Sequence, residues 1–157
     1  MSFAAWDAER ASAIIAEHAG REGATLPILH ALQHAFGYVP SAAVPMIADA
    51  LNLTRAEIHG VVSFYHDFKS VPSGRHVLKL CRAEACQSMG ADPLAEHVQQ
   101  RLGIGWGATT PDGAVTLEPV FCLGLCACSP AAMFDETLIG RASAPKLDAL
   151  VSRLRAA

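Results

Sequence analysis

The amino-acid sequence predicts an α+β fold, with a helical segment over residues 1–73 followed by a second domain over residues 74–157. In the first half, apolar residues recur at the spacing of amphipathic helices. In the second half, short apolar runs separated by turn residues indicate strands, with helical patterns between them. The turn-forming stretch Val71-Pro72-Ser73-Gly74 marks the change of pattern. We therefore expect an N-terminal helical bundle joined to a smaller mixed sheet-and-helix domain.

Four helices are expected in the first half. Gly37 can end the second helix as a left-handed residue, and Pro45 fits the first turn of the third. The fourth opens with the capping box Thr54-Arg55-Ala56-Glu57. It carries aromatic residues that are most simply explained as packing between helices, with docking on a partner as the alternative for part of them. The expected ranges are residues 6–18, 27–36, 44–51 and from 55 to the turn at 71–74, and the aromatic residues are Phe64, Tyr65 and Phe68.

The second half predicts a strand at residues 76–80 that delivers Cys81 at its end. A helix follows, with Asp92 as its N-cap or with a start nearer Ser88, and with Gly103 at its end. A strand over 114–119, a hairpin within 132–140 and a final helix beginning at Pro145 complete the chain. The order β, α, β, β, β, α is compatible with a small thioredoxin-like layer of sheet and helices.

All five cysteines lie in two short stretches. Cys81 and Cys86 are separated by four residues, Cys122 and Cys126 by three, and Cys128 follows closely. Four thiolates arranged as two pairs suit a [2Fe-2S] cluster, because each of its two irons needs two thiolates. A structural zinc site with four cysteines is also compatible with the spacing. Cys128 is either a substitute ligand or an ordinary small side chain of the interior.

Composition excludes several classes of function. The net charge is −3 and no basic run is present, so no nucleic-acid partner is expected. There is no apolar run long enough for a membrane span, and the first residues lack the features of a secretory signal, so we expect a cytoplasmic protein. Hydrophobic residues make up 52% and charged residues 17%, which favours a surface partly covered by partners. No dinucleotide-binding glycine motif is present, so no catalysis by the chain alone is expected.

Charged residues and histidines near these motifs allow two interpretations. Arg82 could stabilise an anionic cluster and Glu84 could favour its oxidised state, or both could simply face solvent or a partner. His30 and His34 have the spacing of a helical metal site, but the glutamate that a zinc protease would require is missing. We expect both histidines on the polar surface.

Several longer stretches resemble one known family. They are residues 26–33, 36–40 and 58–65 of the helical half, the first cysteine pair, and Cys122-Leu123-Gly124-Leu125-Cys126. Together they resemble the 24-kDa-type subunit of NADH:quinone oxidoreductase, a thioredoxin-like [2Fe-2S] ferredoxin. Within that family, residues 122–133 are most similar to the gamma subunit of soluble, molybdenum-containing, NAD-dependent formate dehydrogenases.

The resemblance implies a site and a set of partners. Cys81 and Cys86 would bind one iron of a [2Fe-2S] cluster, and Cys122 and Cys126 the other. The cluster would exchange electrons with the FMN of a partner subunit that also binds NAD, and a molybdenum catalytic subunit would belong to the same complex. The equivalent subunits of NADH:quinone oxidoreductase and of NAD-reducing hydrogenase are alternatives, and a zinc-stabilised assembly module is the non-redox alternative. The N-terminal helices are the expected docking arm.

Overall fold

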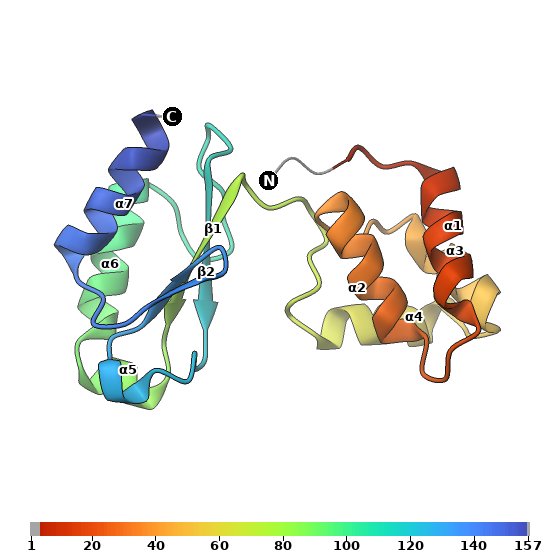
Figure 1. The fold of residues 1–157 in the computed structure, drawn as a ribbon, viewed down its shortest axis with the longest axis horizontal. Coiled ribbons are helices and arrows are strands. Elements are labelled where there is room, and N and C mark those ends of the chain that lie inside the picture. Colours follow the sequence, from red (N-terminus) through yellow and green to blue (C-terminus); the bar gives the residue numbers. More distant parts are fainter. Residues whose placement is uncertain (1–3, 157) are drawn as a thin grey trace. The chain divides into compact units, whose positions relative to one another are not determined.

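The chain forms two compact units that divide between Pro72 and Ser73 (Figure 1). The computed structural model describes residues 4–156, with side chains described as far as residue 153. Each unit has its own hydrophobic core. Within the described residues, none of the helices combines the length and the hydropathy needed to cross a membrane.

Four helices make up the first unit, as predicted. Asp7 caps the first through its carboxylate, which accepts hydrogen bonds from the backbone N–H groups of Glu9 and Arg10. Gly37 ends the second with a φ of 82°, the left-handed conformation that the sequence predicts. The helices are α1 (Ala8–Ala19), α2 (Thr25–Phe36), α3 (Ala43–Leu51) and α4 (Arg55–Phe64).

The core of this unit is built from one face of each helix. Leu29, Leu32 and Phe36 of α2 are buried together, as their helical spacing predicts. Ile47 of α3 and Ile58 of α4 are likewise completely buried. The first unit therefore packs around its own interior.

The predicted end of the fourth helix is wrong. Helix α4 stops at Phe64, because Tyr65 adopts an extended backbone conformation. The side-chain amide of Gln33 holds the next segment, since it donates to the carbonyl of Asp67 (2.7 Å) and accepts from the N–H of Lys69 (2.7 Å). These contacts fix the backbone in a non-helical path that helical spacing does not reveal.

The prediction that the aromatic residues of this region pack as core is correct only for Phe68. The side chain of Phe68 is buried, whereas Phe64 is 73% exposed and Tyr65 is 43% exposed. The three rings contact one another edge to face, at centroid separations of 5.1 and 6.1 Å.

A four-stranded sheet forms the centre of the second unit, with the strand order β2-β1-β3-β4. Strands β1 and β2 are parallel, and the pairs β1–β3 and β3–β4 are antiparallel. The predicted sequence of elements is confirmed, with one short helix added between β1 and the long helix. The elements are β1 (His76–Cys81), α5 (Glu84–Ser88), α6 (Ala91–Leu102), β2 (Val115–Val120), the 3-10 turn η1 (Cys126–Cys128), β3 (Ala132–Phe134), β4 (Thr137–Ile139) and α7 (Ala144–Ala156).

Helices α6 and α7 lie side by side and cover one face of this sheet (Figure 1). Leu78 of β1 and Leu117 of β2 are completely buried against them. Val98 of α6 and Leu147 of α7 complete the same core. This packing fixes which residues of β1 and β2 point inward. It therefore also fixes where the loops after these strands begin.

Helix α6 begins at Ala91, one residue before the predicted N-cap residue Asp92. Asp92 lies inside the first turn of α6, and the N-cap position belongs to Gly90, which has a φ of 87°. The unpredicted helix α5 occupies the preceding residues and carries Cys86. A helix of five residues is too short to leave a periodic pattern, so the sequence gives no signal for it.

The capping box at the start of α4 is present as predicted and gives a test of the first unit. Thr54 and Glu57 exchange hydrogen bonds between their side chains and backbone N–H groups, and these bonds to Thr54 lower the pKa of the Glu57 carboxyl below its ordinary value of 4.5.

We expect Thr54→Ala to lower the free energy of unfolding by about 1 kcal/mol, because an orphan N–H of the first turn loses its acceptor. The measurement is urea unfolding monitored by circular dichroism. Ser63→Ala, at the other end of α4, is the control, since this exposed hydroxyl donates to the carbonyl of Gly60 within the same helix. The difference in the free energy of unfolding between the parent and Thr54→Ala should become smaller as the pH falls below 4.5, because Glu57 then becomes protonated. An equal loss of unfolding free energy in the two variants would contradict the role of Thr54 as the N-cap of α4.

Candidate metal centre

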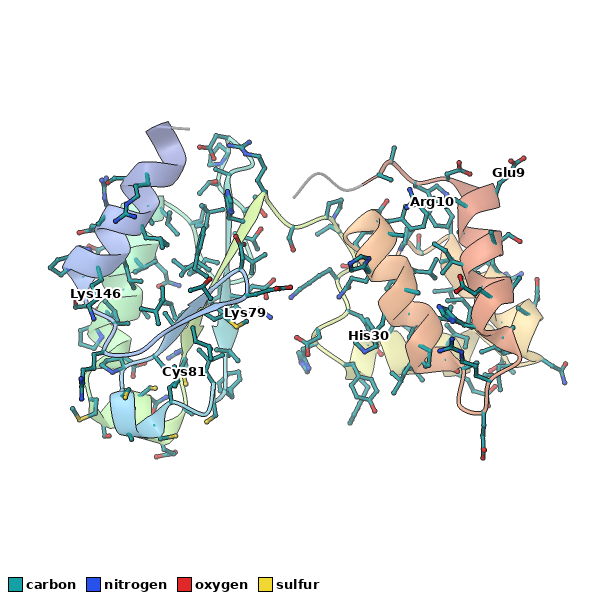
Figure 2. All side chains as sticks on the ribbon, viewed as in Figure 1. Glu9, Arg10, His30, Lys79, Cys81 and Lys146 are labelled. Atoms are coloured by element: carbon teal, nitrogen blue, oxygen red, sulfur yellow. The ribbon has the colours of Figure 1, made fainter. Side chains whose placement is uncertain are left out.

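The two cysteine loops begin at the same edge of the sheet. Strands β1 and β2 run parallel, with Cys81 paired to Val120 at their carboxyl ends. The N–H of Arg82 donates to the carbonyl of Val120 (2.8 Å), which continues the pairing one residue further. Because Cys122 follows only two residues after Val120, both loops start next to each other. Figure 2 shows Cys81 at the end of the sheet where α5 lies.

The first cysteine pair is buried. Cys81 and Cys86 are each 2% exposed, the first at the end of β1 and the second on α5. Their thiols hydrogen-bond each other, and the Cys81 sulfur also accepts hydrogen bonds from the backbone N–H groups of Ala83 and Cys122. The second loop thus donates directly to a sulfur of the first.

Burial and hydrogen bonding act in opposite directions on this pair. Burial is the largest cause that raises the pKa of Cys81 above its ordinary value, and Cys86 adds to it, while the backbone donors act to lower the pKa. Burial also acts to raise the pKa of Cys86, but hydrogen bonding with Ser129, Cys81 and the backbone of Ala131 outweighs it and leaves that pKa lowered. Cys86 is therefore the thiol of this pair whose surroundings favour the thiolate.

The second pair lies at the surface. Cys122 Sγ and Cys126 Sγ are 3.7 Å apart, and both residues are exposed. The N–H of Gly124 donates to Cys122 Sγ (3.3 Å), with Gly124 at a φ of 74°. Cys122 itself has a φ of 111°, which is rare for a residue with a side chain and is typical of strained functional loops.

The thiols of both pairs act electrostatically on Cys126. Hydrogen bonding and charge repulsion from Cys122 raise the pKa of Cys126, and the charges of Cys86 and Cys81 add to the effect. The buried and the exposed pair are therefore close neighbours. Over residues 4–156, no group of three or more His, Cys, Asp and Glu side chains is arranged to hold a single metal ion.

The donor set fits a two-metal group. It offers two sulfurs from each of two loops, and backbone N–H groups already point at sulfur atoms in both loops. A [2Fe-2S] cluster takes two thiolates at each end and is tuned by hydrogen bonds to its sulfurs. The four predicted site residues, Cys81, Cys86, Cys122 and Cys126, are thus brought together at one end of the sheet.

Cys128 occupies a different structural position. Its N–H donates to the carbonyl of Leu125 (2.8 Å), and its carbonyl accepts from the N–H of Arg141 (2.6 Å). Its side chain packs against the backbone of Gly140, where an added Cβ would lie 2.9 Å from Cys128 Cβ. Cys128 therefore joins η1 to the end of the β3–β4 hairpin.

Arg82 is engaged with residues distant in the sequence. Its guanidinium lies over the ring of Trp106, 5.4 Å from the centroid, and its Nη2 is 3.3 Å from Asp92 Oδ1. Glu84 is exposed, which agrees with the interpretation that it faces solvent or a partner. The sequence could not reveal the stacking on Trp106, because no local pattern links a residue of the first cysteine loop to one so much later in the chain.

The two histidines of α2 lie on its surface, as predicted. Both His30 and His34 are exposed, and the His30 ring contacts Phe68 at a centroid distance of 5.0 Å. Sequence reasoning did not single out Ser129, which contacts both cysteine loops. Its position directly after Cys128 was the one available signal.

Comparison with known proteins now defines the class of protein. Residues 11–155 match the family described as thioredoxin-like [2Fe-2S] ferredoxin. The chain belongs to this family, and the predicted fold and the predicted [2Fe-2S] cofactor are confirmed. It is an electron-transfer protein.

Two relatives are subunits of an NADH-quinone oxidoreductase and of an NADP-reducing hydrogenase. The chain is 36% identical over 149 residues to a subunit of the NADH-quinone oxidoreductase of Rhizobium meliloti, covering 95% of this chain and 89% of the relative. It is also 36% identical over 120 residues to the HndA subunit of the NADP-reducing hydrogenase of Solidesulfovibrio fructosivorans, covering 76% of this chain and 70% of the relative.

A solved structure has the same fold. The air-oxidised NAD⁺-reducing [NiFe]-hydrogenase superposes with a TM-score of 0.71 at 26% sequence identity, covering 84% of this chain. The chain spans only 23% of that hydrogenase chain. The equivalent segment of the hydrogenase is therefore part of a much longer polypeptide.

The tight contact between Cys128 and Gly140 can be tested directly. We expect Gly140→Ala to lower the free energy of unfolding by about 1–3 kcal/mol, because the new methyl group overlaps an atom fixed to the backbone. Gly60→Ala is the control, since Gly60 lies within α4 with open space around it, and there alanine should stabilise by roughly 0.5–1 kcal/mol. Thermal unfolding of both variants measures the difference. If both substitutions raised the unfolding temperature, the loop would have to accommodate the methyl group at Gly140 without strain, and the prediction would be wrong.

Proposed function

We propose that this chain is the electron-transfer subunit of a cytoplasmic NAD-dependent formate dehydrogenase complex. Its [2Fe-2S] cluster would exchange electrons with the FMN of a partner subunit that binds NAD. The electron-transfer role in this proposal is supported by the convergence of two cysteine pairs at the carboxyl ends of β1 and β2. The chain is not expected to catalyse a reaction alone.

We propose Cys81 and Cys86 as the ligands of one iron, and Cys122 and Cys126 as the ligands of the other. The group they hold would supply one-electron storage and transfer. The buried pair anchors the site in the fold, since Cys81 ends a central strand and Cys86 lies on α5. The exposed pair presents the other end of the site to the surface, where a partner can approach. Backbone N–H groups in both loops offset the negative charge of the thiolates.

An apolar surface next to the cysteines supports docking on a partner. Phe121, directly before Cys122, is 73% exposed, and Met89, directly after α5, is 61% exposed. Exposed large apolar side chains near a site support an interaction surface there. The relatives named as subunits of oxidoreductases and hydrogenases favour a partner that handles NAD. The longer chain of the NAD⁺-reducing hydrogenase is compatible with a permanent association.

We propose that the two structural units have separate roles. Residues 1–73 would form a helical docking segment and residues 74–157 the cluster domain. The exposed Phe64 and Tyr65 at the end of α4 support a docking role for the first unit. The division of the structure between Pro72 and Ser73 supports this boundary.

The formate dehydrogenase assignment, with a molybdenum catalytic subunit in the same complex, rests on the similarity of residues 122–133 to the gamma subunit of that enzyme class. The equivalent subunit of NADH-quinone oxidoreductase or of an NAD-reducing hydrogenase is the second candidate, because the named relatives are of those kinds. The three candidates share the same cluster and differ in the subunit that supplies or receives electrons.

The ligand assignment predicts different outcomes for two neighbouring cysteines. We expect Cys126→Ser to lose most of the iron and acid-labile sulfide, because one end of the group would lose a thiolate. Cys128→Ser should retain both, since Cys128 packs against Gly140. The measurement is iron and sulfide content per chain, with visible absorbance before and after dithionite. Equal losses in the two variants would refute the assignment. A colourless parent protein with stoichiometric zinc would instead support a zinc-stabilised module.

The identity of the complex can be tested by purification of the tagged chain from its native host. We expect a flavin-containing subunit and a molybdenum-containing subunit to co-purify, and formate to reduce NAD⁺ in the preparation. Visible bleaching of the cluster on addition of NADH would support exchange with the flavin subunit. Co-purification with a nickel-containing subunit or with membrane subunits would overturn the formate dehydrogenase assignment in favour of the second candidate.

A further inference from the structure

Ser129 links the two cysteine loops through a single hydroxyl group. Its Oγ donates to the carbonyl oxygen of Cys126 at 2.7 Å and lies 3.6 Å from the sulfur of Cys86. The residue directly follows η1 and is only 9% exposed. One short polar side chain therefore contacts the backbone of the exposed pair and a sulfur of the buried pair.

Metal binding changes which hydrogen bond this hydroxyl can make to Cys86. A protonated Cys86 thiol can donate its own hydrogen to Ser129 Oγ. A cysteine that binds a metal does so as a thiolate, which has no hydrogen to donate. A hydrogen bond between these two atoms then requires Ser129 to be the donor. The hydroxyl can rotate between the Cys126 carbonyl and the Cys86 sulfur, because both lie within reach.

We infer that Ser129 donates a hydrogen bond to the Cys86 sulfur in the cluster-loaded chain and thereby raises the reduction potential of the cluster. Reduction places more negative charge on the cluster and its sulfur ligands, so a hydrogen-bond donor stabilises the reduced form more than the oxidised form. The buried position strengthens this effect, since little water competes for the sulfur. The inference rests on the proposed role of Cys86 as a ligand.

A second serine near the first cysteine pair has a different hydrogen-bond partner. Ser88, on α5, is exposed, and its Oγ donates to the carbonyl of Ala85 (3.0 Å). Ser88 thus provides a matched control for a serine-to-alanine change next to the first cysteine pair. Ser129 is a positioning and tuning residue, whose influence on electron transfer acts through Cys86.

A redox titration of the full chain purified with its cluster tests the inference. At the potential where half of the parent clusters are reduced, we expect Ser129→Ala to lower the ratio of reduced to oxidised cluster by about three- to tenfold. Ser88→Ala should leave the ratio unchanged. In electron–nuclear double resonance of the reduced cluster, the parent should show one exchangeable-proton coupling in H₂O that Ser129→Ala lacks.

A second pair of variants separates the hydroxyl from its packing. Ser129→Thr keeps the hydroxyl and adds a methyl group, and Ser129→Val has the shape of the threonine variant with the hydroxyl replaced by a methyl group. We expect the threonine variant to titrate close to the parent and the valine variant to be reduced only at lower potential. Full cluster content with the parental potential in both Ser129→Ala and Ser129→Val would overturn the inference. A parent chain without iron would overturn the ligand assignment instead, so the two failures are distinguishable.

Discussion

The parallel pairing of β1 with β2 is the contact on which the metal centre depends. It places Cys81 opposite Val120, so that the loops carrying the two cysteine pairs begin side by side. The register is held by burial, because Leu78 and Leu117 pair with each other and both point into the core beneath α6 and α7. A shift by one residue would turn these side chains to the other face of the sheet. The hydrophobic core thus fixes the positions of the sulfur atoms from a distance.

The surroundings of the cysteines disfavour the negatively charged thiolates that metal binding requires. Burial raises the pKa of Cys81, and the neighbouring thiol of Cys122 raises that of Cys126, so four thiolates would be costly to bring together without compensation. Compensation comes from backbone N–H groups that point at Cys81 and Cys122, and from Ser129 beside Cys86. The metal ions of a cluster would supply the remaining positive charge. The two pairs also differ in exposure, which makes one end of the site an anchor and the other accessible.

The helical unit has a complete interior of its own and still leaves aromatic side chains exposed. Phe36, Ile47 and Ile58 are fully buried within it, whereas Phe64 lies largely in solvent. Such a division suits a segment that folds around its own core and uses the remaining apolar surface for contact with another protein. In the second unit, Phe121 is equally exposed beside the cysteines. Both units therefore carry apolar surface of the kind expected in one component of a larger complex.

Local patterns in the sequence determined the order of the main elements and the candidate ligands. The capping box at Thr54, the helix-ending Gly37 and Gly103, and the hairpin around Asp135 all specify backbone geometry through neighbouring residues. The four cysteines were identifiable because paired thiols in a chain of this composition have few roles other than metal binding.

Only the tertiary structure decided how these elements combine. The end of α4 at Phe64 depends on Gln33, which holds Asp67 and Lys69 from another helix. The buried and exposed ends of the site, and the hydroxyl of Ser129 between them, depend on the register of β1 and β2. These contacts join residues that are far apart in the chain, and no local spacing encodes them. The sequence by itself determined which residues can hold a cluster, and long-range packing decided the surroundings of each sulfur.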